Sequence, residues 1–421
     1  MTPADVNYGK SDFWTWDEAM YDRLRWLREN DPVHWSEETG AYILSRFEEV
    51  TFASKNNELF CSGEGVLPEN PAKLGLIDED EPRHQKLRRL VNQGFTPRMV
   101  KKLEESVQEI IEGSLNDVGA KGTCDFVDDI AVPLPLLVIA KMIGIRHEDF
   151  GRFHHWSDAM ILAQGNMHEP GVAEAAAQAF VEYGQYVSEL IEDRRTTPQD
   201  DLLSILVSAK DEGMIGEHEN NGTRPGFSEE QKEMGNDELI MFCVLLMVAG
   251  NETTRNGLSG GMKLLIENPE ARQRLLDDPS LIPGAMEELL RLTSPVVSFI
   301  RTATQDTEIA GKTIKKGEKV LMLYPSANRD AAQFDRPDEL DIERNPQHLA
   351  FGIGNHFCLG ANLARMELRV AFAELLKRTP DMNYANAGPV MAPSALVRSF
   401  QHMEVIFTPE AAKAAGAGAE A

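Results

Sequence analysis

Apolar residues recur three and four positions apart along much of the chain, the spacing that places them on one face of an α-helix. Several of these runs are far longer than a typical β-strand. The pattern predicts long helices in five segments, Met99 to Val118, Ala173 to Arg195, Glu238 to Ile266, Leu281 to Leu292 and Ala361 to Lys377. It therefore indicates a mainly α-helical protein.

Segments with the pattern of β-strands are short and scattered. They are Tyr42 to Ser45, Glu308 to Ile309, Lys319 to Leu323 and Met403 to Phe407. Strands and helices do not alternate in the βαβ order, which disfavours a doubly wound parallel sheet. We expect a small β-rich region joined to a helical body.

Three stretches break the helical pattern. Asp211 to Asn236 is dense in charge, Asn and Gly and predicts a long exposed loop, and Asn345 to Gly354 predicts a loop rich in turn formers. Residues 410–421 are an Ala/Gly-rich low-complexity tail. Because no Gly/Ser linker divides the remainder, we predict a single large domain over residues 1–409 followed by this tail.

Composition narrows the classes of protein. The chain has 421 residues, of which 42% are hydrophobic, so it is neither disordered nor fibrous. It carries 68 acidic and 42 basic side chains, a net charge of −26, which disfavours a nucleic-acid partner or an anionic membrane. The N-terminus has no signal-peptide pattern, and the most apolar stretch, Leu239 to Ala249, is too short for a transmembrane anchor. Since the four cysteines form no C-x-x-C pair, we expect a reducing, cytoplasmic location.

The segment FGIGNHFCLG, residues 351–360, leads straight into the helix expected at Ala361. A cysteine at a helix start lies among unpaired N–H groups, which favour the thiolate and make Cys358 a candidate metal ligand. The glycines permit a tight turn, and Gly360 lets a flat ligand approach the helix. The alternative is a buried structural cysteine, which is our interpretation of Cys61, Cys124 and Cys243.

The pattern Phe-x-x-Gly-x-x-x-Cys-x-Gly in this segment resembles the haem-binding signature of the cytochrome P-450 superfamily. The resemblance implies the mostly helical fold of that superfamily, as one large domain. It also implies that Cys358 is the axial ligand of a haem b iron, with Phe351, His356 and Gly360 beside the cofactor.

A second segment, AGNETT at residues 249–254, lies in a predicted helix. Two small residues in succession permit close approach of a ligand or of another helix, and a threonine hydroxyl can bond the carbonyl one turn back. The segment resembles the oxygen-binding groove of the same superfamily. The resemblance implies that Ala249 and Gly250 lie against the haem, that Thr253 holds a hydroxyl near dioxygen and that Glu252 relays protons.

Glu288 and Arg291 are three residues apart and share one helix face, a spacing that is common in surface ion pairs. The segment from Phe334 to Arg344 resembles the superfamily's meander, although Leu340 stands where an aromatic residue is usual. The resemblance implies that Glu288, Arg291 and Arg344 form one buried structural network that holds the cysteine loop.

A haem carries two propionates, which need cationic or donor side chains from several elements. The resemblance assigns this role to His84, Arg88, Arg301 and His356, each of which could otherwise be a surface cation.

Together these segments imply a haem-thiolate monooxygenase that inserts one atom of dioxygen into a C–H bond of a small apolar substrate. The residues expected to line the substrate pocket are Leu67, Leu74, Leu246, Val248, Val296, Val297, Phe299, Leu396 and Val397. Nearly all are aliphatic, although each could equally belong to the core. We expect a terpenoid, a sterol side chain or a branched lipid as substrate.

The resemblance also implies that two electrons come from a ferredoxin and its NAD(P)H-dependent reductase. A basic cluster suited to an acidic ferredoxin consists of Lys86, Arg89, Arg98, Lys101 and Lys102, although it could also be a solvated helix face. Two other functions share the cysteine, a peroxide-driven peroxygenase and a non-catalytic haem sensor. Family peroxygenases usually lack the acid–threonine pair, and a sensor does not need it.

Overall fold

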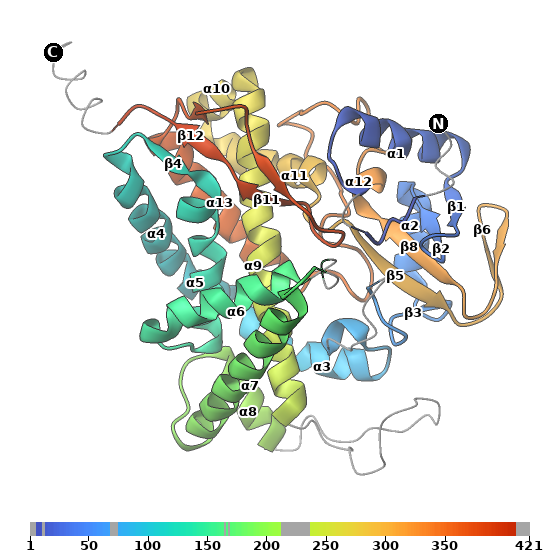
Figure 1. Cartoon of the computed structure of the whole chain (residues 1–421), viewed down its shortest axis with the longest axis horizontal. Coiled ribbons are helices and arrows are strands. Elements are labelled where there is room, and N and C mark those ends of the chain that lie inside the picture. Colours follow the sequence, from blue (N-terminus) through green and yellow to red (C-terminus); the bar gives the residue numbers. More distant parts are fainter. Residues whose placement is uncertain are drawn as a thin grey trace.

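Helix α9 (Asn236–Glu267) runs through the middle of the computed structural model, with helices on one side and a small sheet on the other (Figure 1). The structure describes residues 6–10, 13–67, 75–163, 166, 169–211 and 236–409. Glycines let other helices cross α9 closely: a Cβ at Gly260 would lie 2.4 Å from Thr293, and one at Gly261 would lie 2.6 Å from Phe372. These contacts fix α9 against α11 (Ile282–Thr293) and α13 (Ala361–Arg378).

The five long helices predicted from the sequence are confirmed. They are α4 (Pro97–Gly119), α7 (Val172–Thr196), α9, α11 and α13, and each boundary lies within two residues of the prediction. Helix α4 begins where Thr96 accepts a hydrogen bond from the Met99 amide and Pro97 occupies the first turn. These long helices make up much of the chain, so the protein has a single, mainly helical fold.

Further helices cover the sides of the molecule. They are α1 (Glu18–Asn30), α2 (Phe47–Lys55), α3 (Arg83–Val91), α5 (Pro133–Ile143), α6 (Phe150–Leu162), α8 (Leu202–Asp211), α10 (Pro269–Asp277) and α12 (Tyr324–Ala327). Short 3-10 turns span Leu76–Asp78, Asn92–Phe95, His147–Asp149 and Pro279–Leu281, and a π-helical turn spans Val127–Ala131. Helix α5 is buried on almost every side, so its sequence lacks an amphipathic stripe.

The largest sheet combines N-terminal strands with strands from the last third of the chain (Figure 1). Its order is β1 (Val33–Ser36), β2 (Ala41–Leu44), β8 (Lys319–Leu323), β5 (Ser298–Ala303) and β3 (Phe60–Cys61). Only the β2–β8 pair is parallel within this sheet. The sequence predicted β2 and β8 but not β5, because the buried Arg301 and Thr302 interrupt its apolar pattern.

Three smaller sheets complete the β-rich region. They pair β6 (Thr307–Ile309) with β7 (Lys312–Ile314), β10 (Val390–Ala392) with β11 (Ser399–His402), and β4 (Thr123–Asp125) with β12 (Glu404–Ile406) and β9 (Asn383–Tyr384). Strands β6 and β12 match the predicted segments. The predicted loop at Asn345 to Gly354 contains neither helix nor strand.

Two sequence predictions fall on residues that the structure does not describe. Of the predicted loop from Asp211 to Asn236, only the two end residues are described, at the end of α8 and the start of α9. The tail at residues 410–421 lies outside the described residues altogether. Within the described ranges, every helix is too short or too polar to cross a membrane.

Candidate active site

A large cavity lies between α9, the loop that precedes α13, strand β5 and helix α3. Cys358 lines it, together with Phe351 and Gly360 from the same loop. Ala249, Gly250, Glu252 and Thr253 of α9 line it as well. The two sequence segments that are about a hundred residues apart therefore face one space.

The cysteine loop folds back on itself just before α13. The Cys358 amide donates to the Phe351 carbonyl at 2.9 Å, and the Phe357 amide donates to the Gly354 carbonyl at 3.0 Å. Gly354 has a φ of +80°, and a Cβ there would lie 2.5 Å from the Ser54 carbonyl oxygen. A Cβ at Gly360 would meet no protein atom within 4 Å, so the space beside it is open to a ligand.

Cys358 differs from the other three cysteines, all of which are described. It is exposed toward the cavity, whereas Cys124 and Cys243 are buried in the core and burial raises the pKa of each to about 12. Although its surface is open to the cavity, the surrounding protein desolvates Cys358 and raises its pKa, while the Gly360 amide and the Arg88 guanidinium act in the opposite direction. Cys358 is therefore the thiol placed to bind a metal at this cavity.

Four cationic or donor side chains converge on the cavity, as the sequence predicted from different parts of the chain. The rings of His84 and His356 lie 4.1 Å apart between centroids, and Arg88 of α3 donates to the Phe357 carbonyl. Arg301 of β5 donates to the neighbouring Ile300 carbonyl at 2.7 Å. Burial lowers the pKa of Arg301, and burial together with the nearby cations lowers the pKa of His356 to about 2.

These residues fit a haem. The Nε2 atom of His84 is buried and has no hydrogen-bond partner among the described residues, although it lies on the cavity wall. Two carboxylates would satisfy that atom and the Arg88 and Arg301 guanidinium groups. Cys358 would supply the sulfur ligand of the iron, and the open space beside Gly360 would leave room for the cofactor.

Helix α9 carries the predicted oxygen-binding segment. The Thr253 hydroxyl donates to the Ala249 carbonyl at 2.6 Å, one turn back, so that carbonyl has a second donor inside the helix. Gly250 lines the cavity, but a Cβ there would lie 2.5 Å from Ile139 of α5. The glycine is thus required for packing against α5, which was the alternative considered from the sequence.

The Glu252 carboxylate is buried and held by three donors. Its Oε1 accepts from Ser399 at 2.7 Å, Asn256 at 2.9 Å and Arg255 at 3.0 Å. Arg255 also lies 3.9 Å from Asp158 of α6, whose side chain is half exposed. In the described part of the chain, Glu252 and Thr253 make no hydrogen bond with each other, but charged groups connect Glu252 to the surface.

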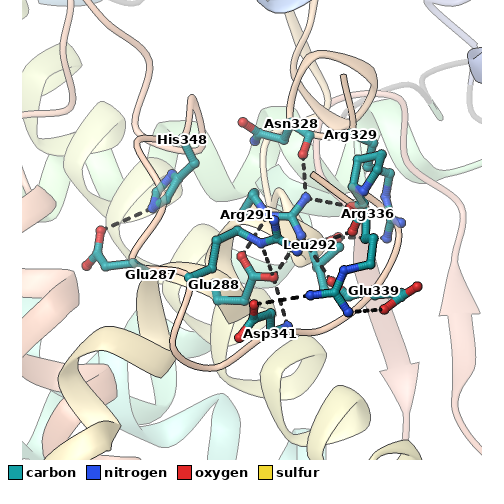
Figure 2. Close-up of polar contacts among 12 residues, drawn as sticks. Glu287, Glu288, Arg291, Leu292, Asn328, Arg329, Arg336, Glu339, Asp341 and His348 are labelled. Atoms are coloured by element: carbon teal, nitrogen blue, oxygen red, sulfur yellow. Dashed lines mark hydrogen bonds and ion pairs between the residues drawn. The ribbon is translucent and has the colours of Figure 1, made fainter. Parts of the chain in front are cut away.

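Glu288 and Arg291 of α11 lie beside each other (Figure 2), and Arg344 joins them from outside that helix. Glu288 accepts from Arg291 through both oxygens, at 2.7 and 2.8 Å, and from Arg344 at 3.0 Å. Arg291 donates to the Asn328 carbonyl at 2.7 Å, and both Glu288 and Arg291 have no exposed side-chain surface. Glu288 and Arg291 therefore belong to a buried network and are not a surface ion pair.

Most of the predicted substrate-pocket residues line the cavity. Those that do are Leu67, Leu246, Val248, Val296, Phe299, Leu396 and Val397. The prediction that Val297 lines the pocket is wrong. Val297 is fully buried in a core cluster with Trp14 and Leu24, because it points away from the cavity that its neighbour Val296 faces. Leu74 lies outside the described residues.

Several cavity residues were missed from the sequence. Tyr324 lines the wall near Arg301, and Ser62 supports the cavity residue His356, whose Nε2 lies 3.1 Å from the Ser62 hydroxyl. Glu367 is buried, bonds Thr254, and burial raises its pKa to about 8. A signal for Glu367 existed, because Gly360, Leu363, Ala364 and Glu367 all line the cavity and follow the spacing of one helix face.

Comparisons with known proteins agree with this site. The sequence profile of the cytochrome P-450 family matches residues 63–379. A steroid C26-monooxygenase of Mycobacterium tuberculosis is 38% identical over 413 residues, which cover 97% of this chain and 99% of the relative. A methyl-branched lipid omega-hydroxylase of the same organism is 37% identical, covering 90% of this chain and 89% of the relative.

Solved structures show the same likeness. A cytochrome P-450 of Mycobacterium marinum in complex with pseudoionone superposes with a TM-score of 0.83 at 34% identity, covering 97% of this chain and 100% of that one. A Bacillus megaterium protein in complex with testosterone superposes with a TM-score of 0.79 at 32% identity. The match covers 92% of this chain and 99% of that one.

Fold, cavity and relatives define a haem-binding monooxygenase. The chain belongs to the cytochrome P-450 family.

Proposed function

We propose that this protein hydroxylates an unactivated C–H bond of an uncharged, largely aliphatic molecule: a terpenoid, a sterol side chain or a branched lipid. The observation that carries the proposal is the lining of the cavity. Its cationic side chains gather around His356, while many of its other residues, among them Leu246, Val296 and Leu396, are aliphatic. The names of the two mycobacterial relatives, which act on a steroid and on a methyl-branched lipid, support this substrate class.

We assign the axial thiolate to Cys358 and the cofactor to haem b, with His84, Arg88, Arg301 and His356 as propionate partners. When bound, the haem supplies the activation of dioxygen, whose one atom enters the substrate and whose other atom leaves as water. The apolar wall orients the substrate by shape and excludes bulk water. Gly360 leaves room for the ring, and the Gly360 and Ala361 amides support the thiolate.

Proton delivery is assigned to Thr253 and Glu252. The Thr253 hydroxyl lines the cavity and can pass on a proton while its oxygen stays near the Ala249 carbonyl. Arg255 pairs with Glu252 at 2.9 Å and lies 3.9 Å from the half-exposed Asp158. These charged groups hold the Glu252 carboxylate between the surface and α9, where it would relay protons toward the cavity.

Electrons are proposed to come from a ferredoxin served by an NAD(P)H-dependent reductase, in the cytoplasm. The exposed residues Lys86 and Arg89 lie on α3, the helix whose Arg88 reaches the cysteine loop. Lys101 and Lys102 are exposed on the first turns of α4. Positive charge on these two helices would attract an acidic partner to a body of net charge −26.

The test of ligation compares Cys358→His with Cys124→Ala, a change at a buried core cysteine. The parent and the Cys124 variant should give the red-shifted Soret band of a thiolate-bound haem in the reduced carbon monoxide complex. Cys358→His should give the imidazole-type band. A thiolate-type band in Cys358→His would refute the assignment.

Substrate class is tested with matched ligand pairs: a terpenoid, a sterol and a branched alkane, each with an analogue bearing a terminal charge. We expect the uncharged member of each pair to shift the Soret band and to be hydroxylated with NADH, ferredoxin and reductase. Preference for the charged members would contradict the proposal. Product formed with hydrogen peroxide alone would favour the peroxygenase, and no product under either condition would favour a sensor.

A further inference from the structure

The ring of Phe351, in the cysteine loop, is held between charged and aromatic side chains. The Arg365 guanidinium carbon lies 4.6 Å from the centroid of the Phe351 ring, a cation–π contact. The centroid of the His348 ring lies 5.8 Å from that of the Phe351 ring. The Phe357 ring packs edge-on against Phe351, with the centroids 6.3 Å apart. His348 and Phe357, near Phe351 in the chain, therefore provide part of the contacts that fix Phe351, and Arg365 of α13 provides the rest.

Arg365 is itself held in place by Glu287 of α11. The pair is bidentate: Nε donates to Oε1 at 2.7 Å and Nη2 donates to Oε2 at 2.8 Å. About a third of the Arg365 side chain is exposed, whereas Glu287 is mostly buried. Although burial opposes it, hydrogen bonds from Arg365 and His348 lower the pKa of Glu287 to about 2.

His348 completes the arrangement, and its tautomer is determined by the backbone. The Ala350 amide donates to Nδ1 at 3.1 Å, so Nε2 carries the hydrogen and donates to Glu287 Oε2, also at 3.1 Å. Figure 2 shows His348 on its loop facing Glu287 on α11. Glu287 thus joins a residue of the cysteine loop to a residue of α13.

Arg365, Glu287 and His348 influence Cys358 in two ways. The Phe351 carbonyl accepts the Cys358 amide hydrogen at 2.9 Å, so movement of Phe351 moves the cysteine backbone. The Arg365 charge also lies close to the cysteine, since it stacks on Phe351, the residue that accepts the Cys358 amide hydrogen. Glu287 opposes that charge because it is the counter-ion of Arg365.

We infer that the Arg365–Glu287 pair, with His348, positions Phe351 and Cys358 and sets the reduction potential of the haem. The inference rests on the proposed ligation by Cys358. The reduced haem–thiolate centre carries one more negative charge than the oxidised centre, so positive charge nearby favours reduction. Arg365 therefore raises the potential, and Glu287 lowers it by compensating Arg365.

The test uses the haem-loaded protein and measures the potential by spectroelectrochemistry. Arg365→Gln should reduce the equilibrium constant for reduction at least threefold, which is about 28 mV at 59 mV per tenfold for one electron. Glu287→Gln should shift it in the opposite direction, because the amide can still accept from Arg365 but no longer neutralises it. Arg365→Lys retains the charge and should restore most of the potential lost in Arg365→Gln.

Arg369→Gln is the matched control. Arg369 lies one turn further along α13, pairs with Glu104 and has an exposure similar to that of Arg365. Because Arg365 is the arginine that stacks on Phe351, removal of Arg369 should shift the potential less than removal of Arg365. Shifts of the same sign in Arg365→Gln and Glu287→Gln, or potentials equal to the parent's, would overturn the inference.

The reduced carbon monoxide spectrum separates this result from a failure of the proposed ligation. A thiolate-type band with unmoved potentials refutes the role of Arg365 and leaves Cys358 as the ligand. A band of another type in the parent protein refutes the ligation itself. If Arg365→Gln loads too little haem to measure, the opposite shift in Glu287→Gln and the behaviour of Arg365→Lys still decide the question.

Discussion

The hydroxyl of Ser399 donates a 2.7 Å hydrogen bond to the buried carboxylate of Glu252, although 147 positions separate the two residues. Ser399 begins β11 and Glu252 lies midway along α9, so the bond joins this strand to the helix that carries the acid. Ser399 is thus part of the immediate surroundings of the proposed proton donor.

Removal of that hydroxyl in Ser399→Ala should destabilise the protein by about 1–3 kcal/mol, since the carboxylate loses one of its three donors while it stays buried. Chemical denaturation measures the change. Ser399→Thr retains a hydroxyl and should recover most of the loss. Ser188→Ala, which removes a hydroxyl bonded to its own helix at Gly184, provides the control. Equal stability of the Ser399→Ala variant and the parent would mean that the bond contributes nothing.

Thr253→Ala should leave haem and substrate binding close to the parent's, because within the described ranges the hydroxyl bonds only the Ala249 carbonyl of its own helix. The share of electrons released as hydrogen peroxide should rise, since proton delivery at the cavity is impaired. The measurement is product formed per NADH consumed. Thr253→Ser keeps the hydroxyl and should remain coupled; a tightly coupled alanine variant would exclude the role.

Glu288→Ala should give little or no haem-loaded protein. The change leaves the guanidinium of Arg291 buried without its partner, which typically costs about 3–5 kcal/mol. Yield of holoprotein per total protein is the measurement. Glu343→Ala removes a carboxylate from an exposed ion pair with Arg274 and should load haem normally. A well-folded, haem-loaded Glu288 variant would show that the network is dispensable.

Glu367 makes stability depend on pH. Burial raises its pKa to about 8 from an ordinary value of 4.5, so between these values the folded chain holds a proton that the unfolded chain has released. Stability should therefore fall as pH rises through this window, by on the order of a few kcal/mol in all. Glu367→Gln should remove this dependence and gain stability relative to the parent toward pH 8.

Denaturation at several pH values checks the effect of Glu367. The exposed Glu105→Gln should leave the pH profile as in the parent. Parallel profiles for the parent and Glu367→Gln would contradict the prediction.

Electron transfer from ferredoxin should slow as salt is added, because the Debye length shrinks to about 3 Å at 1 M. Lys101→Glu with Lys102→Glu should slow it at low salt, although Lys102 already pairs with Asp200 at 2.6 Å. The same charge reversal at Lys315 and Lys316, exposed residues just after β7, is the control. First-electron rates that respond to neither salt nor the double variant would point to another docking surface.

The chemistry of the site could be expected from local sequence together with the family resemblance. Cys358 before a helix, the AGNETT segment and the Glu288–Arg291 spacing are short-range patterns that depend on a turn, a helix face or a dipole. Alone they also allowed a structural cysteine, helix packing and a surface ion pair, and the resemblance decided among these alternatives. The long helices could be predicted for the same reason, because their apolar residues repeat within a window of a few turns.

Only the tertiary structure decided how distant residues meet. Val296 and Val297 are indistinguishable by residue type, yet the first lines the cavity and the second is core, because the entry into β5 determines which one points inward. Ser399 reaches Glu252, and Arg365 stacks on Phe351, only after packing brings separate elements together. Such contacts depend on the crossing of α9, α11 and α13 and on the sheet beside them, and residues within one element carry no information about that geometry.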